Sequence, residues 1–304
     1  MSFVSDLING ADNKFDHSSL NALQKVTLRA VVMAFLFYGL AAIEGMIMRT
    51  ASVVPSIPPV YGSPEHYFSI MTVHPIVGIF GSTYQLVFGA FMFLVPFLTK
   101  KPLYSVKLAN WVWLLITIGT ALSWIAAFAW NYAPLYTLYW PLPADTEQFK
   151  TVGGIVFILG VALIMFGTFG FIYNIYATIF ARVGVHQNKT MKELLISGFG
   201  IDGILNLWYK LTGRQPYTKE PALSLPVVAI FRGTVDTFLD ALIILGAGIL
   251  VLVYLFADLG GLSLDVKSVD ALLYKNWFWW GLDLVADGLV LIYVAGSWYL
   301  LATI

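Results

Sequence analysis

The amino-acid sequence predicts an all-α membrane protein, a polytopic bundle of about six transmembrane helices. Of its 304 residues, 59% are hydrophobic and only 11% are charged, a composition that excludes a water-soluble globular domain. Apolar runs of roughly 20 residues, long enough to cross the hydrocarbon core, recur between polar or proline-containing breaks. We interpret these runs as helices because a helix satisfies its own backbone hydrogen bonds in lipid, and because the alternating pattern of barrel strands is absent.

The expected spans follow one another along a single integral membrane domain, 1–304. Their approximate bounds are 27–48, 69–98, 108–131, 152–180, 227–257 and 276–303. The fourth span carries glycines that let a neighbouring helix approach closely, at positions 153, 154, 160, 167 and 170. The connection 181–226 contains LLISGFGIDGILNLWYKL, which mixes aromatic and aliphatic residues with few charges. We expect this connection to form a helix on the membrane surface rather than a docking site for a partner.

Basic residues are distributed unevenly between the two sides of the expected bundle. With the amino terminus inside, twelve lie on the cytoplasmic side: Lys14, Lys25, Arg29, Lys100, Lys101, Lys107, Arg182, Lys189, Lys192, Lys210, Arg214 and Lys219. Four then lie outside: Arg49, Lys150, Lys267 and Lys275. Because cytoplasmic loops carry the excess of Lys and Arg, this bias predicts a cell-membrane protein in which segments 1–26 and 181–226 are cytoplasmic.

Charge and cysteine content exclude several functions. Seventeen basic and seventeen acidic residues cancel, so no net field attracts nucleic acid. The absence of cysteine excludes disulfides and thiolate metal sites. The sequence also has no phosphate-binding loop, dinucleotide-binding glycine pattern or zinc-protease spacing. The remaining chemistry must come from a few polar side chains within or beside the spans.

Several acidic and basic residues lie well inside the expected spans, among them Glu44, Arg232, Asp236, Asp240, Asp283 and Asp287. Each costs about 2.5–3.5 kcal/mol to insert, so each requires a partner, a cavity or a function. Four-residue steps place Arg232, Asp236 and Asp240 on one helix stripe and stack Asp283 over Asp287. The helical rise brings Asp240 and Asp287 to a similar depth, where we expect that they can meet.

Two interpretations of these ionisable residues are open. In the first, Arg232 and Asp236 pair at the inner boundary of the membrane, and the other acids face partner subunits or internal water. In the second, the acids form a route for protons or cations. The residue pattern is compatible with both.

His74 stands near the start of the second span, in YFSIMTVHPIVGIFGSTYQLVFGAFMFLVP. A neutral imidazole is a common ligand of haem iron, and an aromatic-rich apolar bundle can enclose a porphyrin. The alternative is a structural hydrogen bond at a helix end. Because proline favours the first helical turn, a helix that begins at Pro75 would leave His74 as a cap at the interface.

Three segments carry a resemblance to a known family: TVH at 72–74 with the apolar run that ends in FLVP, PLYTLYWPLPAD at 134–145, and LLYKNWFWWGLDLVAD at 272–287. In this order they resemble the second helix, the external TLYPPL-type segment and the FWWxGHPxVY segment of the catalytic subunit (subunit I) of haem–copper oxidases, especially its ba3-type branch. Trp140 stands where the TLYPPL-type segment has its first proline. The resemblance covers the amino-terminal half of that subunit, about helices one to six.

The resemblance implies one ligand and the loss of another. His74 matches the family's second-helix ligand to the low-spin haem, although Pro75 stands where glycine is usual. Asp283 stands at the position of the copper-binding histidine and Asp287 at that of the tyrosine joined to it, so the ordinary copper site is not expected; carboxylates suit harder ions than copper. The histidines of the family's seventh and tenth helices have no counterpart before Ile304. A partner chain would have to supply the second haem ligand and the carboxy-terminal half.

The sequence therefore leaves three functional hypotheses. The favoured one is a membrane subunit of a respiratory terminal-oxidase-type complex, which holds or scaffolds a low-spin haem together with other subunits. It would pass electrons from a quinol or redox protein and would not be catalytic alone. The second is a haem-free structural subunit. The third is a proton- or ion-conducting subunit that uses the intramembrane aspartates, and it is compatible with either of the others.

Overall fold

The computed structural model describes residues 21–54, 64–183 and 186–303, and the secondary structure of this part of the chain is helical. Within it, six helical segments are long and apolar enough to cross a membrane. They are α2 (Ala22–Val53), the continuous segment His66–Thr99, α5 (Val106–Ala129), α6 (Thr151–Phe180), α9 (Leu225–Leu259) and α10 (Ala271–Thr303). The predicted spans are confirmed, with ends that differ by a few residues. Of the predicted segment 1–26, residues 1–20 lie outside the described residues.

The second span changes its helical type after a proline. It consists of α3 (Pro64–Pro75), the π-helix η3 (Ile76–Tyr84) and α4 (Gln85–Thr99). Proline has no backbone N–H and its ring clashes with the carbonyl four residues earlier, so an ordinary α-helix cannot continue unchanged through Pro75. A π-helical stretch is one way to keep the chain helical past such a point, and it often marks a functional site.

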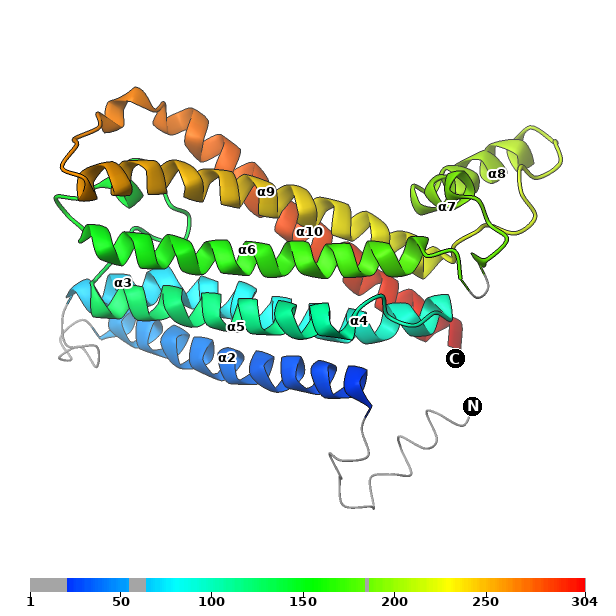
Figure 1. Cartoon of the computed structure of the whole chain (residues 1–304), viewed down its shortest axis with the longest axis horizontal. Coiled ribbons are helices and arrows are strands. Elements are labelled where there is room, and N and C mark those ends of the chain that lie inside the picture. Colours follow the sequence, from blue (N-terminus) through cyan, green and yellow to red (C-terminus); the bar gives the residue numbers. More distant parts are fainter. Residues whose placement is uncertain (1–20, 55–63, 184–185, 304) are drawn as a thin grey trace, which may run out of the picture.

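Close backbone contact between helices organises the bundle. In Figure 1, α6 lies between α5 and α9, while α10 crosses behind both α9 and α6. A Cβ atom on Gly119 of α5 would lie 2.5 Å from the carbonyl oxygen of Gly160 on α6. Gly233 of α9 and Gly288 of α10 face each other in the same way. The predicted role of the glycines in the fourth span is thus confirmed, because only glycine lets these backbones approach so closely.

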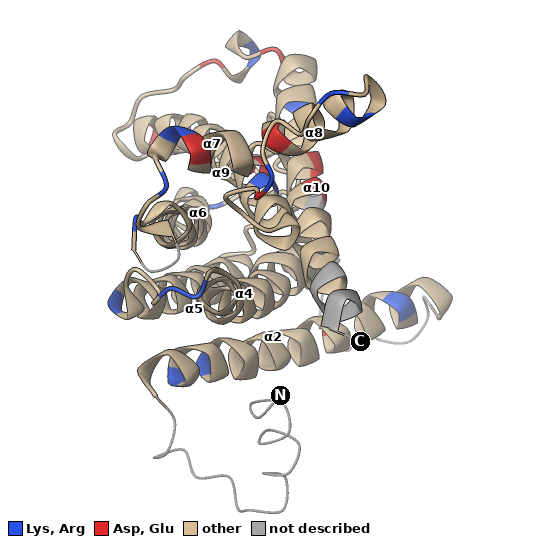
Figure 2. Cartoon of the chain, turned by 90° about the vertical axis from the view of Figure 1, so that its right-hand side faces the viewer, with Lys and Arg blue, Asp and Glu red and all other residues tan. Residues whose placement is uncertain are grey.

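The described basic residues of the predicted cytoplasmic loops gather at one end of the bundle. At this end α2, α5 and α9 begin, and α4, α6 and α10 finish (Figure 1). Figure 2 views this end and shows Lys and Arg on its loops and helix ends. Two further helices lie here, α7 (Met191–Gly198) and α8 (Ile201–Leu211). The predicted helix in the connection 181–226 is therefore present, as a hairpin of two short helices.

The opposite end is closed by the connection between α5 and α6. It contains the short 3₁₀ helix Leu142–Ala144, and a second one, Val266–Ser268, precedes α10. The Trp140 indole donates to the carbonyl oxygen of Val266 (2.7 Å) and packs against Tyr274. The Trp279 indole donates to the hydroxyl of Tyr139 (2.8 Å). The segments 134–145 and 272–287, which carry the family resemblance, are therefore in direct contact.

Lys101 closes the carboxyl end of α6. Its buried ammonium lies 2.6 Å from the carbonyl oxygen of Ile179, 2.7 Å from that of Ala181 and 3.3 Å from that of Thr178. These carbonyls include helix-end groups that have no partner within the helix. Burial lowers the pKa of Lys101 from 10.5 to about 8, so the charged form of this side chain depends on its carbonyl partners.

Replacing Lys101 with methionine is expected to destabilise the fold. The variant keeps the apolar stem but leaves the α6 carbonyls without their donor, and a buried unsatisfied carbonyl costs about 1–3 kcal/mol. The midpoint of thermal unfolding in detergent should fall. Lys107→Met at an exposed position of α5 is the matched control, and an equal fall in both variants would contradict the capping role.

Candidate functional site

His74 lies in the last turn of α3 and packs against α2. Its Nδ1 atom is 3.0 Å from the carbonyl oxygen of Ala41. A Cβ atom on Gly45 would lie 3.3 Å from the imidazole Cε1 atom, so the absence of a side chain at that position makes room for the ring. The helix begins at Pro64, with Pro75 inside it. The alternative in which a helix starts at Pro75 and His74 caps it is therefore wrong. A structural hydrogen bond made by His74, the other part of that alternative, is present.

The contacts of His74 fit an iron ligand. A metal-ligating histidine usually donates its other ring N–H to a carbonyl or carboxylate, which fixes the tautomer and the orientation of the ring. When Nδ1 donates to Ala41, the lone pair of Nε2 is left available, and this is the neutral form that binds haem iron. The half-buried imidazole is thus held in place through one nitrogen, with the second nitrogen able to coordinate.

Glu44 is a buried carboxyl group beside this contact, one residue before Gly45. The Trp124 indole of α5 donates to its Oε1 atom at 2.8 Å. The Oε2 atom is also buried and meets no hydrogen-bond donor in the described part of the chain. Only 3% of the residue is exposed. Glu44 therefore joins α2 to α5 through one oxygen and leaves the other unpaired.

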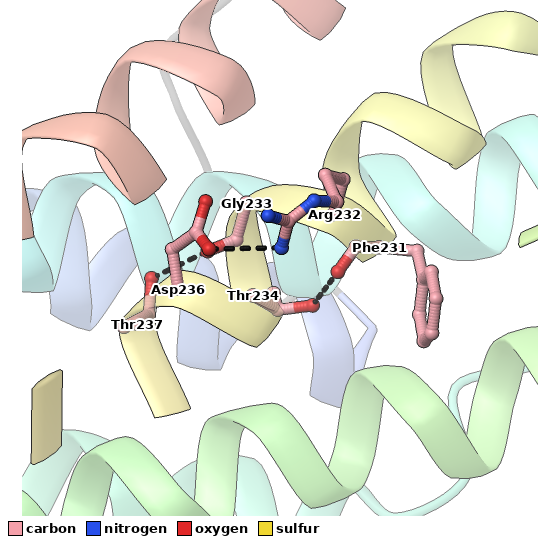
Figure 3. Close-up of polar contacts among 6 residues, drawn as sticks. All are labelled: Phe231, Arg232, Gly233, Thr234, Asp236 and Thr237. Atoms are coloured by element: carbon pink, nitrogen blue, oxygen red, sulfur yellow. Dashed lines mark hydrogen bonds and ion pairs between the residues drawn. The ribbon is translucent and has the colours of Figure 1, made fainter. Parts of the chain in front are cut away.

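Arg232 and Asp236 form the ion pair that the sequence predicted as one of two alternatives. Their side chains lie one turn apart on α9 and point toward each other (Figure 3). The distance from Arg232 Nη1 to Asp236 Oδ1 is 2.8 Å. The Arg232 side chain is 51% exposed, whereas that of Asp236 is 9% exposed. Thr237 beside them donates to the carbonyl oxygen of Gly233. The pair thus places a guanidinium group at the surface of α9 and a carboxylate just beneath it.

Asp240 lies one turn deeper and is fully buried. The Tyr84 hydroxyl, at the end of the π-helix, donates to its Oδ2 atom at 2.9 Å. The Oδ1 atom is buried and receives no hydrogen bond from any described residue. Tyr84 was not among the predicted site residues. A hydroxyl inside an apolar run was the available signal, but the sequence did not indicate which residue it would contact.

The structure does not bring Asp240 and Asp287 together. Asp283 and Asp287 are both exposed on α10, while Asp240 is fully buried. The contact between the two helices is made by Gly288, whose position lies against Gly233 and Thr237 of α9. The expected meeting is therefore wrong because similar depth does not fix rotation about the helix axis: Asp287 is turned out of the interface that its neighbour occupies.

Comparison with known proteins places the chain in a family. The sequence model of the family described as Cytochrome C and Quinol oxidase polypeptide I matches residues 25–304. The chain belongs to this family. It is a multi-pass membrane protein related to subunit I of the cytochrome c oxidases, as the resemblance of its segments predicted.

Curated relatives match part of the chain. A cytochrome c oxidase subunit 1 homolog of Agrobacterium tumefaciens (strain T37) is 30% identical over 176 residues, which cover 50% of this chain and 28% of the relative. The homolog of Azorhizobium caulinodans is also 30% identical over 176 residues, covering 53% and 29%. Cytochrome c oxidase subunit 1 of Rhodobacter capsulatus is 29% identical over 171 residues, covering 50% and 29%. The matched part spans less than a third of each of these relatives.

Proposed function

We propose that the chain is a membrane subunit of a respiratory terminal-oxidase-type complex and holds a low-spin haem together with a partner chain. The observation that carries the proposal is the hydrogen bond from His74 Nδ1 to Ala41, which leaves Nε2 available as an axial ligand. Within the family we assign the chain to the ba3-type branch, which its sequence motifs resemble most. The basic end of the bundle faces the cytoplasm, so the amino terminus is cytoplasmic and the host is the cell membrane.

The residues of this chain orient the imidazole. Ala41 accepts the Nδ1 proton, and Gly45 lets the ring lie close to α2. A haem bound there would supply one-electron transfer. Its second axial ligand would come from a partner chain that contributes the remaining half of the core, and a quinol or redox protein would donate the electrons.

We also propose that this chain does not reduce oxygen at a copper site. Asp283 and Asp287 stand where the resemblance expects the copper-binding histidine and its tyrosine, and carboxylate oxygens suit harder ions than copper. Both side chains are exposed on α10. This chain would therefore transfer electrons within the complex and would not reduce oxygen alone.

Purification from native membranes in mild detergent tests the proposal. We expect a complex whose reduced-minus-oxidised spectrum has the narrow α-band of a low-spin haem, with a second polypeptide that carries histidines within its membrane spans. A complex that contains this chain but binds no haem would overturn the proposal and favour the alternative, a haem-free structural subunit.

A second candidate function, proton transfer, is favoured by the contact between Asp240 and Tyr84. Arg232 and Asp236 lie near the basic end of the bundle, and Asp240 follows one turn deeper with one oxygen unpaired. Beyond it, α9 continues as ALIILGAGILVLVYLF, without a charged residue. We propose that these groups carry protons from the cytoplasmic side to mid-membrane, because protonatable residues in series are how such routes are built. The remaining acids of the predicted route, Glu44, Asp283 and Asp287, have no described hydrogen bond to this series.

Asp240→Asn is expected to lower proton uptake from the basic side while the complex still assembles. The amide keeps the size of the side chain and can accept the hydrogen bond from Tyr84, but it cannot carry a proton. Uptake is measured with a pH-sensitive dye in proteoliposomes. Glu193→Gln at the exposed start of α7 is the control, and unchanged uptake in Asp240→Asn would remove Asp240 from the route.

A further inference from the structure

The helix α8 has its polar and apolar faces reversed relative to a soluble surface helix. Its large apolar side chains are exposed: Ile201, Ile204, Leu207, Trp208 and Leu211, with exposed fractions between 43% and 73%. They recur at steps of three and four residues and therefore share one side of the helix. We call this side the apolar face of α8.

The polar side of α8 faces the protein. The Asn206 amide donates to the carbonyl oxygen of Thr218 and accepts from its backbone N–H, both at 3.0 Å. Asp202 is only 6% exposed, and its Oδ1 atom accepts from the N–H of Gly203. The two hydrogen bonds between Asn206 and Thr218 and the burial of Asp202 thus hold the polar side of α8 inward. The apolar face points outward, which is unfavourable in water.

The hairpin is anchored where the spans end. The Phe199 ring, between α7 and α8, packs edge-on against Phe231 of α9, with ring centres 5.2 Å apart. Phe231 lies in the second turn of α9, and α9 begins at the basic end of the bundle (Figure 1). In the end view of Figure 2, α8 projects sideways beyond the bundle. Residues 186–223 contain five basic and three acidic residues, and this excess suits the anionic surface of a membrane.

We propose that the apolar face of α8 lies in the boundary between headgroups and acyl chains, in the leaflet at the basic end of the bundle. Trp208 suits this boundary because its ring is largely apolar and its N–H can reach water. Lys210 and Arg214 extend toward the headgroups, as basic residues do beside interfacial helices. The occupant of this surface is therefore lipid, and the proposal does not depend on whether His74 binds haem.

The absence of cysteine in the chain makes a direct test possible. Three variants each carry one cysteine with a nitroxide label. Two of the cysteines replace Ile204 and Leu211 on the apolar face. The third replaces Gly203, where a side chain would meet nothing within 4 Å. The full complex is reconstituted in vesicles of phosphatidylcholine and phosphatidylglycerol. Power-saturation EPR then measures collisions of the label with oxygen, which concentrates in lipid, and with a water-soluble nickel chelate.

The labels at 204 and 211 are expected to collide several-fold more with oxygen than with the nickel chelate, and the label at 203 is expected to show the reverse. Nickel accessibility at 204 and 211 equal to that at 203 would place the apolar face in water. Low accessibility to both reagents at 204 and 211 would show that another protein covers the face. Either of these results would overturn the proposal.

Discussion

His74→Ala is expected to abolish the low-spin haem absorbance of the purified complex while the helices still assemble. Alanine removes the proposed iron ligand together with its hydrogen bond to the Ala41 carbonyl. Haem content per complex, measured as the pyridine haemochrome, should fall by one low-spin haem. Circular dichroism should show unchanged helix content, because the imidazole is half-buried and makes a single hydrogen bond.

Two further variants separate ligation from packing. His66→Ala removes the other imidazole of the same span, which packs near Phe128, and is expected to retain the haem. Gly45→Val places methyl groups against the His74 ring, since even a Cβ atom would come within 3.3 Å. This variant should weaken haem retention by about 10–100-fold, the range seen when the surroundings of a ligand are disturbed. Full haem retention in His74→Ala would remove the ligand role.

Gly160→Leu is expected to prevent the stable packing of α5 against α6. A Cβ atom at this position would lie 2.7 Å from the carbonyl oxygen of Gly119 and 2.5 Å from Ser123 Oγ. Overpacking a core costs about 1–3 kcal/mol and occasionally more, and a collision with backbone cannot be relieved by rotating a side chain. We therefore expect a loss of at least about 3 kcal/mol, seen as aggregation or loss of the monodisperse peak in size-exclusion chromatography.

Gly39→Leu provides the control for this packing prediction. Gly39 lies on the exposed side of α2, where a Cβ atom would meet nothing within 4 Å. The added side chain should leave the elution profile unchanged. If Gly160→Leu behaved like Gly39→Leu, the close approach of α5 and α6 would be contradicted.

The spans could be predicted from the sequence because hydrocarbon thickness and backbone hydrogen bonding leave few solutions for long apolar runs. The pair of Arg232 and Asp236 was predictable for a related reason, since a four-residue step on one helix brings two side chains together whatever surrounds them. The glycines of α6 likewise indicated close contact. These predictions depend on local sequence and the membrane alone.

Contacts between different helices could not be predicted in the same way. Depth along an axis can be estimated from sequence position, but rotation about the axis depends on packing with neighbouring helices. For this reason the sequence did not predict the contact between Asp240 and Tyr84. It also did not predict that Asp287 is exposed and does not contact Asp240. The π-helix after Pro75 was missed for a comparable reason. Proline indicates that the regular α-helix must change, but it does not indicate whether the chain breaks, kinks or widens.

Coordination of iron by this chain can be measured most directly by pulsed EPR on the oxidised complex. The complex is assembled with this chain alone carrying ¹⁵N-histidine, in a background where His17, His66 and His186 are replaced by glutamine. We expect ¹⁵N hyperfine coupling at the low-spin haem, because His74 is then the sole labelled histidine. A low-spin haem signal without this coupling, or a stable complex without haem, would contradict it.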